Sequence, residues 1–284
     1  MRKRILFTGG NGFIGRNVIP ILQESFDVYA PEREELDLFD AKDVREYLLE
    51  NRINCIVHSA NPNPSKNKLD TVERMLRDSL QMFMTMYSCR DLVEKLIYLG
   101  SGAIYDKTME IRSISEECEH RSIPKDDYGF AKYIMSYLTK GNIYNLCLFG
   151  CYGPGDADHK FITHCIRCCL RHEPITIHQN CMFDYFHVTD LGRVIAWMIN
   201  AKPQHHTYNV CSGEPIPILD IAKTVKRLME SDLKIEVFQE GWNREYTGSN
   251  ARLIREYPGK FVSLEDGIKM QIKWEKENYE VIKK

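Results

Sequence analysis

Three side chains in the middle of the chain have types and spacing that suit proton transfer. Tyr128 and Lys132 stand at positions i and i+4 of "DYGFAKY", so a helix brings both onto one face. Ser101 follows the apolar run "KLIYLG", where a buried strand would end at its carboxyl edge. Free tyrosine has a pKa of about 10, so it transfers protons near neutral pH only when its phenolate is stabilised, and a lysine one turn away can do that. The same pair is also common on ordinary helix faces, so its meaning depends on the elements around it.

A glycine-rich segment near the start of the chain predicts a phosphate-binding turn. "LFTGGNGFIG" (6–15) sets Gly9, Gly12 and Gly15 between an apolar run and the helical pattern "RNVIPILQ". A strand, a glycine turn and a helix direct backbone N–H groups and the positive helix end toward a pyrophosphate. A tight turn with close helix packing would also explain this G-x-x-G-x-x-G spacing. Its place at the head of an alternating chain favours dinucleotide binding.

Strand and helix signals alternate through the first half of the chain. Strand-like runs such as "RILFTG", "NCIVHSAN" and "KLIYLGS" are separated by helical patterns such as "AKDVREYLLENR". This predicts an α/β fold of the Rossmann type, a doubly wound parallel sheet with helices on both faces. Pro20 lies inside the first helical pattern and predicts a kink or an early end there.

A Gly/Pro-rich junction, "CYGPGDADH" (151–159), divides the chain. We therefore expect a dinucleotide-binding domain over residues 1–155, rejoined by about 184–212. Residues 156–284 would form mainly a smaller C-terminal α/β substrate-binding lobe.

The composition is that of an ordinary globular protein: 284 residues, 43% hydrophobic, 27% charged, net charge −2. Charges of both signs are interspersed, which argues against nucleic acid as a partner. No apolar run approaches the roughly 18 residues of a membrane span, and the first residues do not resemble a signal peptide. Ten cysteines without a secretory signal fit reduced, mostly buried thiols, and we expect a cytoplasmic protein with no membrane partner.

The segment "HCIRCCLRH" is the best candidate for a metal site. His164, Cys168 and His172 would share one helical face. Structural zinc sites usually pair ligand doublets on separate elements, whereas Ile166 and Leu170 give this segment the apolar stripe of one packed helix. We therefore expect no metal.

Taken together, the motifs resemble the extended short-chain dehydrogenase/reductase family, in its nucleotide-sugar branch. They are "TGGNGFIG", Ser101 ahead of "AIYD", Tyr128-x-x-x-Lys132, "CYGPGD" and "FDYFHVTDL", in family order over nearly the whole chain. The resemblance implies that Tyr128 is the catalytic proton donor. It also implies that Lys132 lowers the Tyr128 pKa and binds the nicotinamide ribose, and that Ser101 orients the substrate oxygen.

The resemblance further implies a nicotinamide cofactor. The residues it places at that cofactor are Thr8, Gly9, Asn11, Gly12, Phe13, Ile14, Gly15, Arg33, Asp37, Leu38, Ser59 and Ala60, together with Tyr128 and Lys132. An acid at the end of the second strand usually binds the NAD ribose, whereas an arginine there receives the 2′-phosphate of NADP. Glu32 stands beside Arg33, and Arg33 matches the family's phosphate-binding arginine. We expect NADPH in preference to NADH.

The expected substrate contacts are Ala103, His159, Lys160, Arg167 and Arg244. Three positions depart from the family pattern: Phe183 replaces an arginine that contacts the diphosphate, and Gly150 and Asp78 replace asparagines. Arg244, in "WNREY", matches a second diphosphate-binding arginine, and a guanidinium can bind phosphate bidentately.

The resemblance is strongest to 4-keto reductases of the GDP-fucose synthase, dTDP-4-dehydrorhamnose reductase and CDP-paratose synthase type. Gly102 and Ala103 follow Ser101, where dehydratases carry an acidic pair, and Ala103 replaces the cysteine of the epimerising synthases. The expected reaction is NAD(P)H-dependent reduction of the C4 keto group of a nucleotide-diphosphate-linked 4-keto-6-deoxy sugar, without C3/C5 epimerisation. A GDP-sugar is favoured, with CDP or dTDP left open.

Two other functions stay open. One is a C4 epimerase with tightly bound NAD, and the other is a non-catalytic cofactor-binding relative. Family members often dimerise through the helices that here hold "RMLRDSL" and "YIMSYL", so we expect a homodimer.

Overall fold

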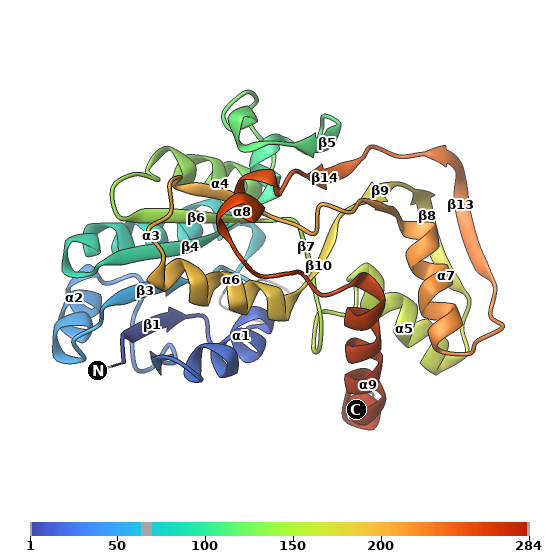
Figure 1. Cartoon of the computed structure of the whole chain (residues 1–284), viewed down its shortest axis with the longest axis horizontal. Coiled ribbons are helices and arrows are strands. Elements are labelled where there is room, and N and C mark those ends of the chain that lie inside the picture. Colours follow the sequence, from blue (N-terminus) through green and yellow to red (C-terminus); the bar gives the residue numbers. More distant parts are fainter. Residues whose placement is uncertain (1, 64–69, 283–284) are drawn as a thin grey trace.

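A six-stranded parallel sheet forms the centre of the first part of the chain in the computed structural model, which describes residues 2–63 and 70–282. Its strands are β1 (Arg4–Thr8), β2 (Asp27–Tyr29), β3 (Cys55–His58), β4 (Lys95–Ser101), β6 (Ile143–Leu148) and β11 (Thr207–Val210). They lie in the order β11-β6-β4-β3-β1-β2 (Figure 1). The pairings are parallel throughout, so the strands end at one common edge.

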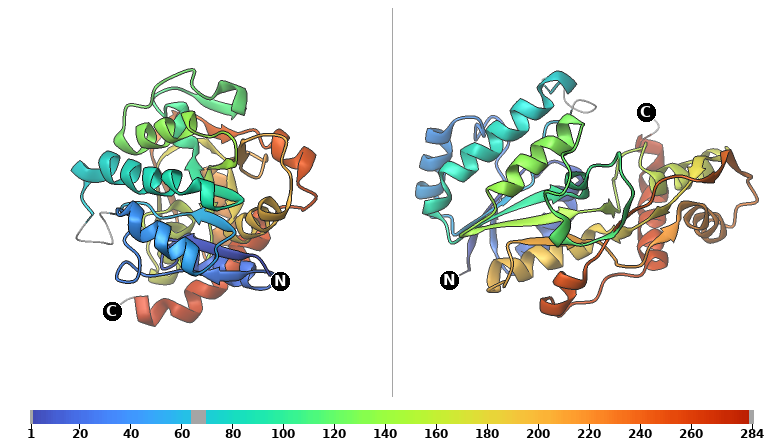
Figure 2. Two further views of the ribbon diagram at one scale, coloured as in Figure 1. Left: turned by 90° about the vertical axis from the view of Figure 1, so that its left-hand side faces the viewer. Right: turned by 90° about the horizontal axis from the view of Figure 1, so that it is seen from above.

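Helices cover both faces of this sheet because neighbouring residues of its strands point into opposite cores. Ile5 and Phe7 of β1 enter one core, and Leu6 enters the other. On the first face pack α1 (Phe13–Gln23) and α6 (Val188–Asn200), and on the second α2 (Ala41–Glu50), α3 (Met75–Ser88) and α4 (Asp127–Tyr137) (Figure 2). The predicted doubly wound α/β fold is confirmed.

The first helix differs from its prediction at Pro20. Helix α1 continues past Pro20 and ends at Gln23, so the proline does not end it early. Helix α2 begins as its sequence indicates, because the Asp40 carboxylate accepts hydrogen bonds from the N–H groups of Lys42 and Asp43.

A second, smaller group of elements surrounds a separate core. It contains α5 (Phe161–Arg171), α7 (Ile218–Leu228), α9 (Leu264–Ile282), β8 (Ile175–Asn180) and β13 (Ile235–Trp242). Figure 1 shows this group beside the open end of the large sheet. The domain limits stay a prediction, although α6 packs on α1 and β11 pairs with β6 in the first part of the fold.

Short strands connect the two groups. β5 (Ile111–Ile114), β9 (Met182–Phe183), β12 (Ile216–Pro217) and β14 (Tyr246–Gly248) form a sheet in the order β12-β9-β14-β5, and β7 (Gly150–Tyr152) pairs with β10 (Tyr185–His187). The remaining elements are α8 (Ala251–Glu256) and the 3-10 turns η1 (Val72–Arg74), η2 (Arg90–Leu92), η3 (Gly102–Tyr105) and η4 (Glu116–Cys118). Because β14 pairs with β5, the C-terminal part of the chain contacts the segment between β4 and α4.

All ten cysteines are free thiols, and most are buried. Within residues 2–63 and 70–282, none of the helices has the length and hydropathy needed to cross a lipid bilayer.

Candidate active site

A cleft of about 480 Å³ opens at the carboxyl ends of β4 and β6. It brings together residues that are far apart in the chain: Phe13, Ile14, Gly100, Ser101, Ala103, Lys107, Tyr128, Leu148, Phe149, Gly150, Cys151, Tyr152, Asp156, Lys160, Phe161, Ile162, Phe183, Tyr185 and Tyr246. This edge is where doubly wound sheets bind their ligands. Ser101, Tyr128 and the start of α1 therefore face one space, as a shared cofactor and substrate site requires.

Ser101 and Tyr128 reach the cleft from two adjoining elements. Ser101 is the last residue of β4, and its Oγ accepts a hydrogen bond of 3.2 Å from the N–H of Ala103. Tyr128 lies in the first turn of α4, and the carboxylate of Asp126, the residue before this helix, accepts a 2.9 Å hydrogen bond from the N–H of Gly129. Burial raises the pKa of Tyr128, and a hydrogen-bonding interaction with Ser101 opposes that rise. At neutral pH the Tyr128 phenol is therefore protonated.

Lys132 follows Tyr128 by one turn of α4. Its Nζ is 5.8 Å from the centre of the Tyr128 ring and donates a 2.9 Å hydrogen bond to the backbone oxygen of Leu99. Burial lowers the pKa of Lys132 to about 8. Burial is the largest cause of the upward shift of the Tyr128 pKa, and the lowering of that pKa by Lys132 stays a prediction.

The glycine turn has the geometry of a phosphate cradle. Gly9 has a φ of +74°, and a Cβ there would lie 2.9 Å from the Cα of Ala60. A Cβ on Gly15 would lie 2.2 Å from the backbone oxygen of Gly10, so α1 packs on the turn only without a side chain. Gly12 begins α1 with no side-chain cap, which leaves the first N–H groups of the helix for a ligand. The turn therefore fits a pyrophosphate.

The buried side chains of Thr8 and His58 are in contact with each other next to the glycine turn. Thr8 Oγ1 lies 2.9 Å from His58 Nδ1 and accepts a 3.1 Å hydrogen bond from the N–H of Ala60. Burial, together with the charge of Lys132, lowers the pKa of His58 to about 3, so the imidazole is neutral. Thr8 and Ala60 thus join β1 to the end of β3, where Ser59 also lies.

The remaining cofactor candidates lie at and after the end of β2. Arg33 forms a 3.0 Å ion pair with Asp70, whereas Asn11 donates to the Glu32 carboxylate at 3.1 Å. Asp37 is exposed and accepts a hydrogen bond from the N–H of Phe39. Leu38 packs against the core beneath α2. Arg33 is half exposed, so a 2′-phosphate would compete with Asp70 for its guanidinium.

Of the five expected substrate contacts, two line the cleft and three do not. Ala103 and Lys160 line the cleft, whereas His159 is exposed at the start of α5. Arg167 is buried and does not line the cleft; it binds Glu275 at 2.9 Å and also pairs with Asp158. Arg244 is exposed and is not among the residues that line the cleft. Hydrogen bonds from Thr108, aided by the charges of Lys125 and Arg244, lower the pKa of Asp106.

Two of the departures from the family pattern, Gly150 and Phe183, lie side by side. A Cβ on Gly150 would lie 2.4 Å from the Asp184 backbone oxygen and 2.8 Å from Cε1 of Phe183. The Phe183 ring packs against Tyr185 at 4.6 Å and Tyr246 at 5.2 Å between ring centres. An aromatic wall therefore occupies the place where the pattern has an arginine and an asparagine.

The third departure, Asp78, is buried on α3. It is bound by Arg74 at 3.2 Å and Arg77 at 2.8 Å, so its charge is paired by the residue just before α3 and by a residue of α3 itself.

Sequence reasoning missed the aromatic residues of the cleft. Tyr246 and Phe149 carry no family motif. Phe149 directly follows β6, whereas the place of Tyr246 depends on the pairing of β14 with β5. The only available signal for Tyr246 was its position two residues after Arg244 in "WNREY".

The histidine and cysteine segment forms no metal cluster. His164 contacts Cys168 at 3.6 Å and Thr176 at 3.2 Å, and His172 lies beyond the end of α5 with a φ of +57°. Among the residues that the structure describes, no three metal-binding side chains gather anywhere.

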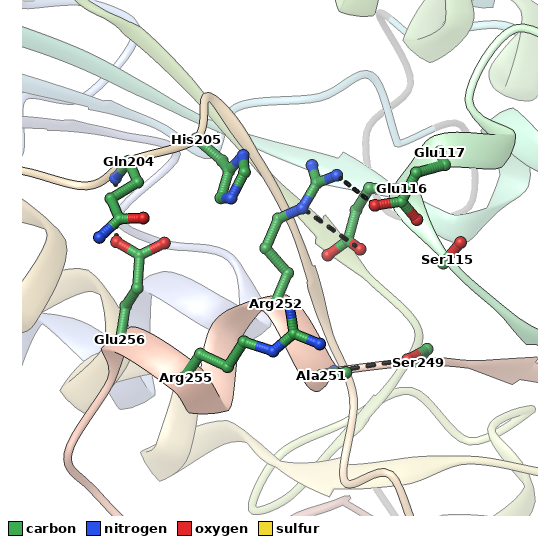
Figure 3. A pocket seen from close by; sticks show the side chains of 10 residues that line it. All are labelled: Ser115, Glu116, Glu117, Gln204, His205, Ser249, Ala251, Arg252, Arg255 and Glu256. Atoms are coloured by element: carbon green, nitrogen blue, oxygen red, sulfur yellow. Dashed lines mark hydrogen bonds and ion pairs between the residues drawn. The ribbon is translucent and has the colours of Figure 1, made fainter.

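A second cavity, of about 350 Å³, lies beside α8 and η4 (Figure 3). Arg252 pairs with two carboxylates of the cavity lining, at 2.9 Å from Glu117 and 3.7 Å from Glu116. The described residues that line it include none of the motif residues, and we assign it no site.

Fold and site together define a doubly wound α/β protein with a dinucleotide-type glycine turn and a cleft bearing serine and tyrosine hydroxyls. A family model described as "NAD dependent epimerase/dehydratase family" matches residues 5–211, and the chain belongs to this family. Its members are NAD(P)-dependent oxidoreductases and epimerases of the extended short-chain dehydrogenase/reductase type, so the resemblance found in the sequence is confirmed.

Individual proteins show the same relationship. GDP-L-fucose synthase of Azorhizobium caulinodans is 31% identical over an alignment of 170 residues that covers 54% of each chain, so the match spans about half of that relative. GDP-L-fucose synthetase from Naegleria fowleri bound to NADP has a TM-score of 0.83 at 20% identity, covering 98% of this chain and 94% of that one. A GDP-6-OMe-4-keto-L-xylo-heptose reductase from C. jejuni has a TM-score of 0.79 at 18% identity, covering 98% of both chains. These structures share the fold.

Proposed function

We propose that this protein reduces the C4 keto group of a nucleotide-diphosphate-linked 4-keto-6-deoxy sugar with NADPH. The observation that carries the proposal is the cleft in which Ser101 and Tyr128 face the start of α1, with Lys132 buried behind them. Ketone reduction needs a hydride donor and an acid beside one another, and this cleft adjoins a turn that fits a dinucleotide.

The direction of the Tyr128 pKa shift supports reduction. A phenol whose pKa is raised by burial keeps its proton at neutral pH and is therefore poised to donate it to an oxygen that gains negative charge. Ser101, fixed by the N–H of Ala103, would hold that oxygen. Reduced nicotinamide, when bound, supplies the hydride. The Lys132 ammonium would then stabilise the Tyr128 phenolate left after proton transfer.

The lining of the cleft supports a simple reduction. Ala103 is buried beside Ser101 and has no group that could remove a proton from C3 or C5. We therefore propose that no C3/C5 epimerisation accompanies the reduction. Turnover in deuterated water should give product without deuterium at C3 or C5, and deuterium at either carbon would contradict the proposal.

The nucleotide and cofactor preferences are further parts of the proposal. The name of the Azorhizobium relative supports a GDP-sugar over a CDP- or dTDP-sugar. Half-exposed Arg33 supports NADPH over NADH, since its guanidinium can receive a 2′-phosphate.

The test is loss of reduced-nicotinamide absorbance with NADPH and then NADH, against GDP-, CDP- and dTDP-linked 4-keto-6-deoxy sugars. Oxidation with one sugar and not with the Tyr128→Phe protein is the expected result. If all substrates fail and the purified protein retains NAD, the C4 epimerase becomes the better assignment. If all fail and cofactor still binds to an NAD-free protein, the chain is a non-catalytic relative.

We also propose a homodimer. Helices α3 and α4 pack side by side at the surface, and Met84 and Tyr137 of these helices are 45% and 57% exposed. Light scattering after gel filtration should give twice the mass of the chain, and the double variant Met84→Glu, Tyr137→Glu should be monomeric. A monomeric wild-type protein would refute this part.

A further inference from the structure

The aromatic wall of Phe183, Tyr185 and Tyr246 lines the cleft and is held by two pairs of short strands. In the β9–β14 pair Phe183 is the register partner of Tyr246, so their side chains are neighbours on one face of the sheet. In the β7–β10 pair the partner of Tyr185 is Gly150, which has no side chain. A Cβ there would lie 2.8 Å from Cε1 of Phe183 and 2.9 Å from Cδ1 of Tyr185, so the glycine leaves room for both rings. The position of the wall therefore follows from backbone pairing.

Packing around the wall keeps its rings in place. Phe149 is 8% exposed and lies 5.3 Å from Tyr246 between ring centres. A Cβ on Gly248 would lie 2.7 Å from Cε2 of Phe149, and a Cβ on Gly102 would lie 2.5 Å from the Tyr246 hydroxyl oxygen. Tyr185 packs against the core of the second, smaller group of elements. The rings therefore cannot turn aside from a ligand without disturbing close-packed neighbours.

The charged side chains of the cleft are not part of the wall. Among the described lining residues they are Lys107, Asp156 and Lys160. A sugar hydroxyl packed against the Phe183 ring would lose its hydrogen bonds to water and gain none from that ring. A hydrogen atom or a methyl group at the same place loses no hydrogen bond and buries apolar area. The wall therefore favours an apolar part of the substrate.

The wall adjoins the residues that would hold the reacting carbonyl group. Gly102, beside the Tyr246 hydroxyl, directly follows Ser101 in the chain. In the proposed reaction Ser101 and Tyr128 bind the oxygen at C4, and the ring carbons next to C4 are C3 and C5. C5 carries the C6 methyl group of the 6-deoxy sugar, which is already apolar. C3 is therefore the neighbouring carbon at which the wall can distinguish one sugar from another.

We infer that Phe183 is a specificity-determining residue, which selects sugars that carry hydrogen or a methoxy group instead of a hydroxyl at C3. This inference rests on the proposed ketone reduction and narrows its substrate class. Phe183 takes no part in hydride or proton transfer, because its ring has no group that exchanges a proton. Its effect is on substrate affinity, through the desolvation of the C3 substituent.

Calorimetry with three 6-deoxyhexoses tests the inference. They carry hydroxyl, hydrogen or methoxy at C3 and a hydroxyl at C4, and each is linked in turn to GDP, CDP and dTDP. NADPH is present, so no reaction occurs. The wild-type protein should bind the hydrogen or the methoxy compound at least about 10-fold more tightly than the hydroxyl compound. Tighter binding of the hydrogen compound indicates a deoxygenated natural substrate, and tighter binding of the methoxy compound indicates an alkylated one. Equal binding of all three would overturn the inference.

Three variants assign the preference to Phe183. Phe183→Asn supplies an amide that can hydrogen-bond to a hydroxyl, so the preference should disappear. Phe183→Leu stays apolar and should keep most of it. Phe238→Asn removes a ring that is 68% exposed on β13, outside the cleft, and is the matched control with an unchanged preference. A preference that survives in a folded Phe183→Asn protein would overturn the inference, and the wild-type measurement decides the matter if this variant does not fold.

Turnover separates this inference from the proposed function. If the 4-keto forms are not reduced while the binding preference is found, only the proposed function fails. If they are reduced with equal kcat/KM and bind equally, only the role of Phe183 fails. A protein that binds none of the sugar nucleotides would refute both.

Discussion

Replacing Glu275 by leucine should destabilise the protein strongly and leave substrate affinity almost unchanged. Glu275 is fully buried and binds Arg167, whose side chain is 5% exposed, at 2.9 Å and 3.4 Å. Loss of one partner leaves a buried charge without compensation, which costs about 3–5 kcal/mol. Because Asp158 still pairs with Arg167, we expect the lower end, about 3 kcal/mol. For a chain of this size that lowers Tm by about 6–12 °C.

Thermal and urea unfolding measure this cost, and KM for the sugar nucleotide measures the role of Arg167 in binding. Removing both charges, with Arg167→Met and Glu275→Leu together, should recover most of the lost stability, since an apolar pair can replace a buried ion pair. Glu94→Gln is the control: its ion pair with Lys3 is short, at 2.6 Å, but Glu94 is 54% exposed, so its loss should cost under about 1 kcal/mol. If Glu275→Leu loses less than about 1 kcal/mol while Arg167→Met raises KM at constant Tm, Arg167 is the substrate ligand expected from the sequence.

Three further predictions concern the cofactor half of the protein. Gly15→Ala should weaken dinucleotide binding at least about 10-fold, because its Cβ would lie 2.2 Å from the Gly10 backbone oxygen; calorimetry showing an unchanged Kd would contradict this. The pKa of His58 is about 3 in the folded state, below its ordinary value of 6.5. Between pH 6.5 and pH 3 the unfolded chain therefore binds more protons than the folded one. The free energy of unfolding should fall as the pH drops through this window, by at most about 5 kcal/mol. Urea midpoints at several pH values should show a flatter acid dependence for His58→Gln than for the wild type, and parallel curves would reject this. Asp70→Asn should free the Arg33 guanidinium and lower KM for NADPH about 3-fold relative to KM for NADH. Equal changes in KM for both cofactors would show that Arg33 does not bind the 2′-phosphate.

The sequence indicated the parts of the site that depend on short-range order. Ser101 ends a buried strand, Tyr128 and Lys132 are one helical turn apart, and the glycine turn follows β1; each is a local pattern with a fixed place in a doubly wound sheet. These residues consequently lie where they were expected.

Long-range pairing explains what the sequence could not indicate. Arg167 looks like a free cation on a helix until Glu275, 108 residues later, is brought against it. The direction of the Tyr128 pKa shift depends on burial by several elements, and the spacing of a lysine says nothing about that. Tyr246 gains its place only when β14 pairs with β5, across 135 positions of sequence between Ile111 and Tyr246.

The pairing of β5 with β14 also limits how substrate specificity can be engineered. Exchange of the C-terminal lobe between relatives, joined at the "CYGPGD" turn, would separate Ile111 from its partner strand, because Ile111 belongs to the N-terminal parent. The lost contacts would include the 3.0 Å hydrogen bond from the Ile111 N–H to the Glu245 backbone oxygen and the 2.7 Å bond from the Ser113 N–H to Thr247 Oγ1. A functional chimera must therefore carry residues 111–114 with the lobe. The transferable unit is discontinuous in sequence, although it is continuous in space.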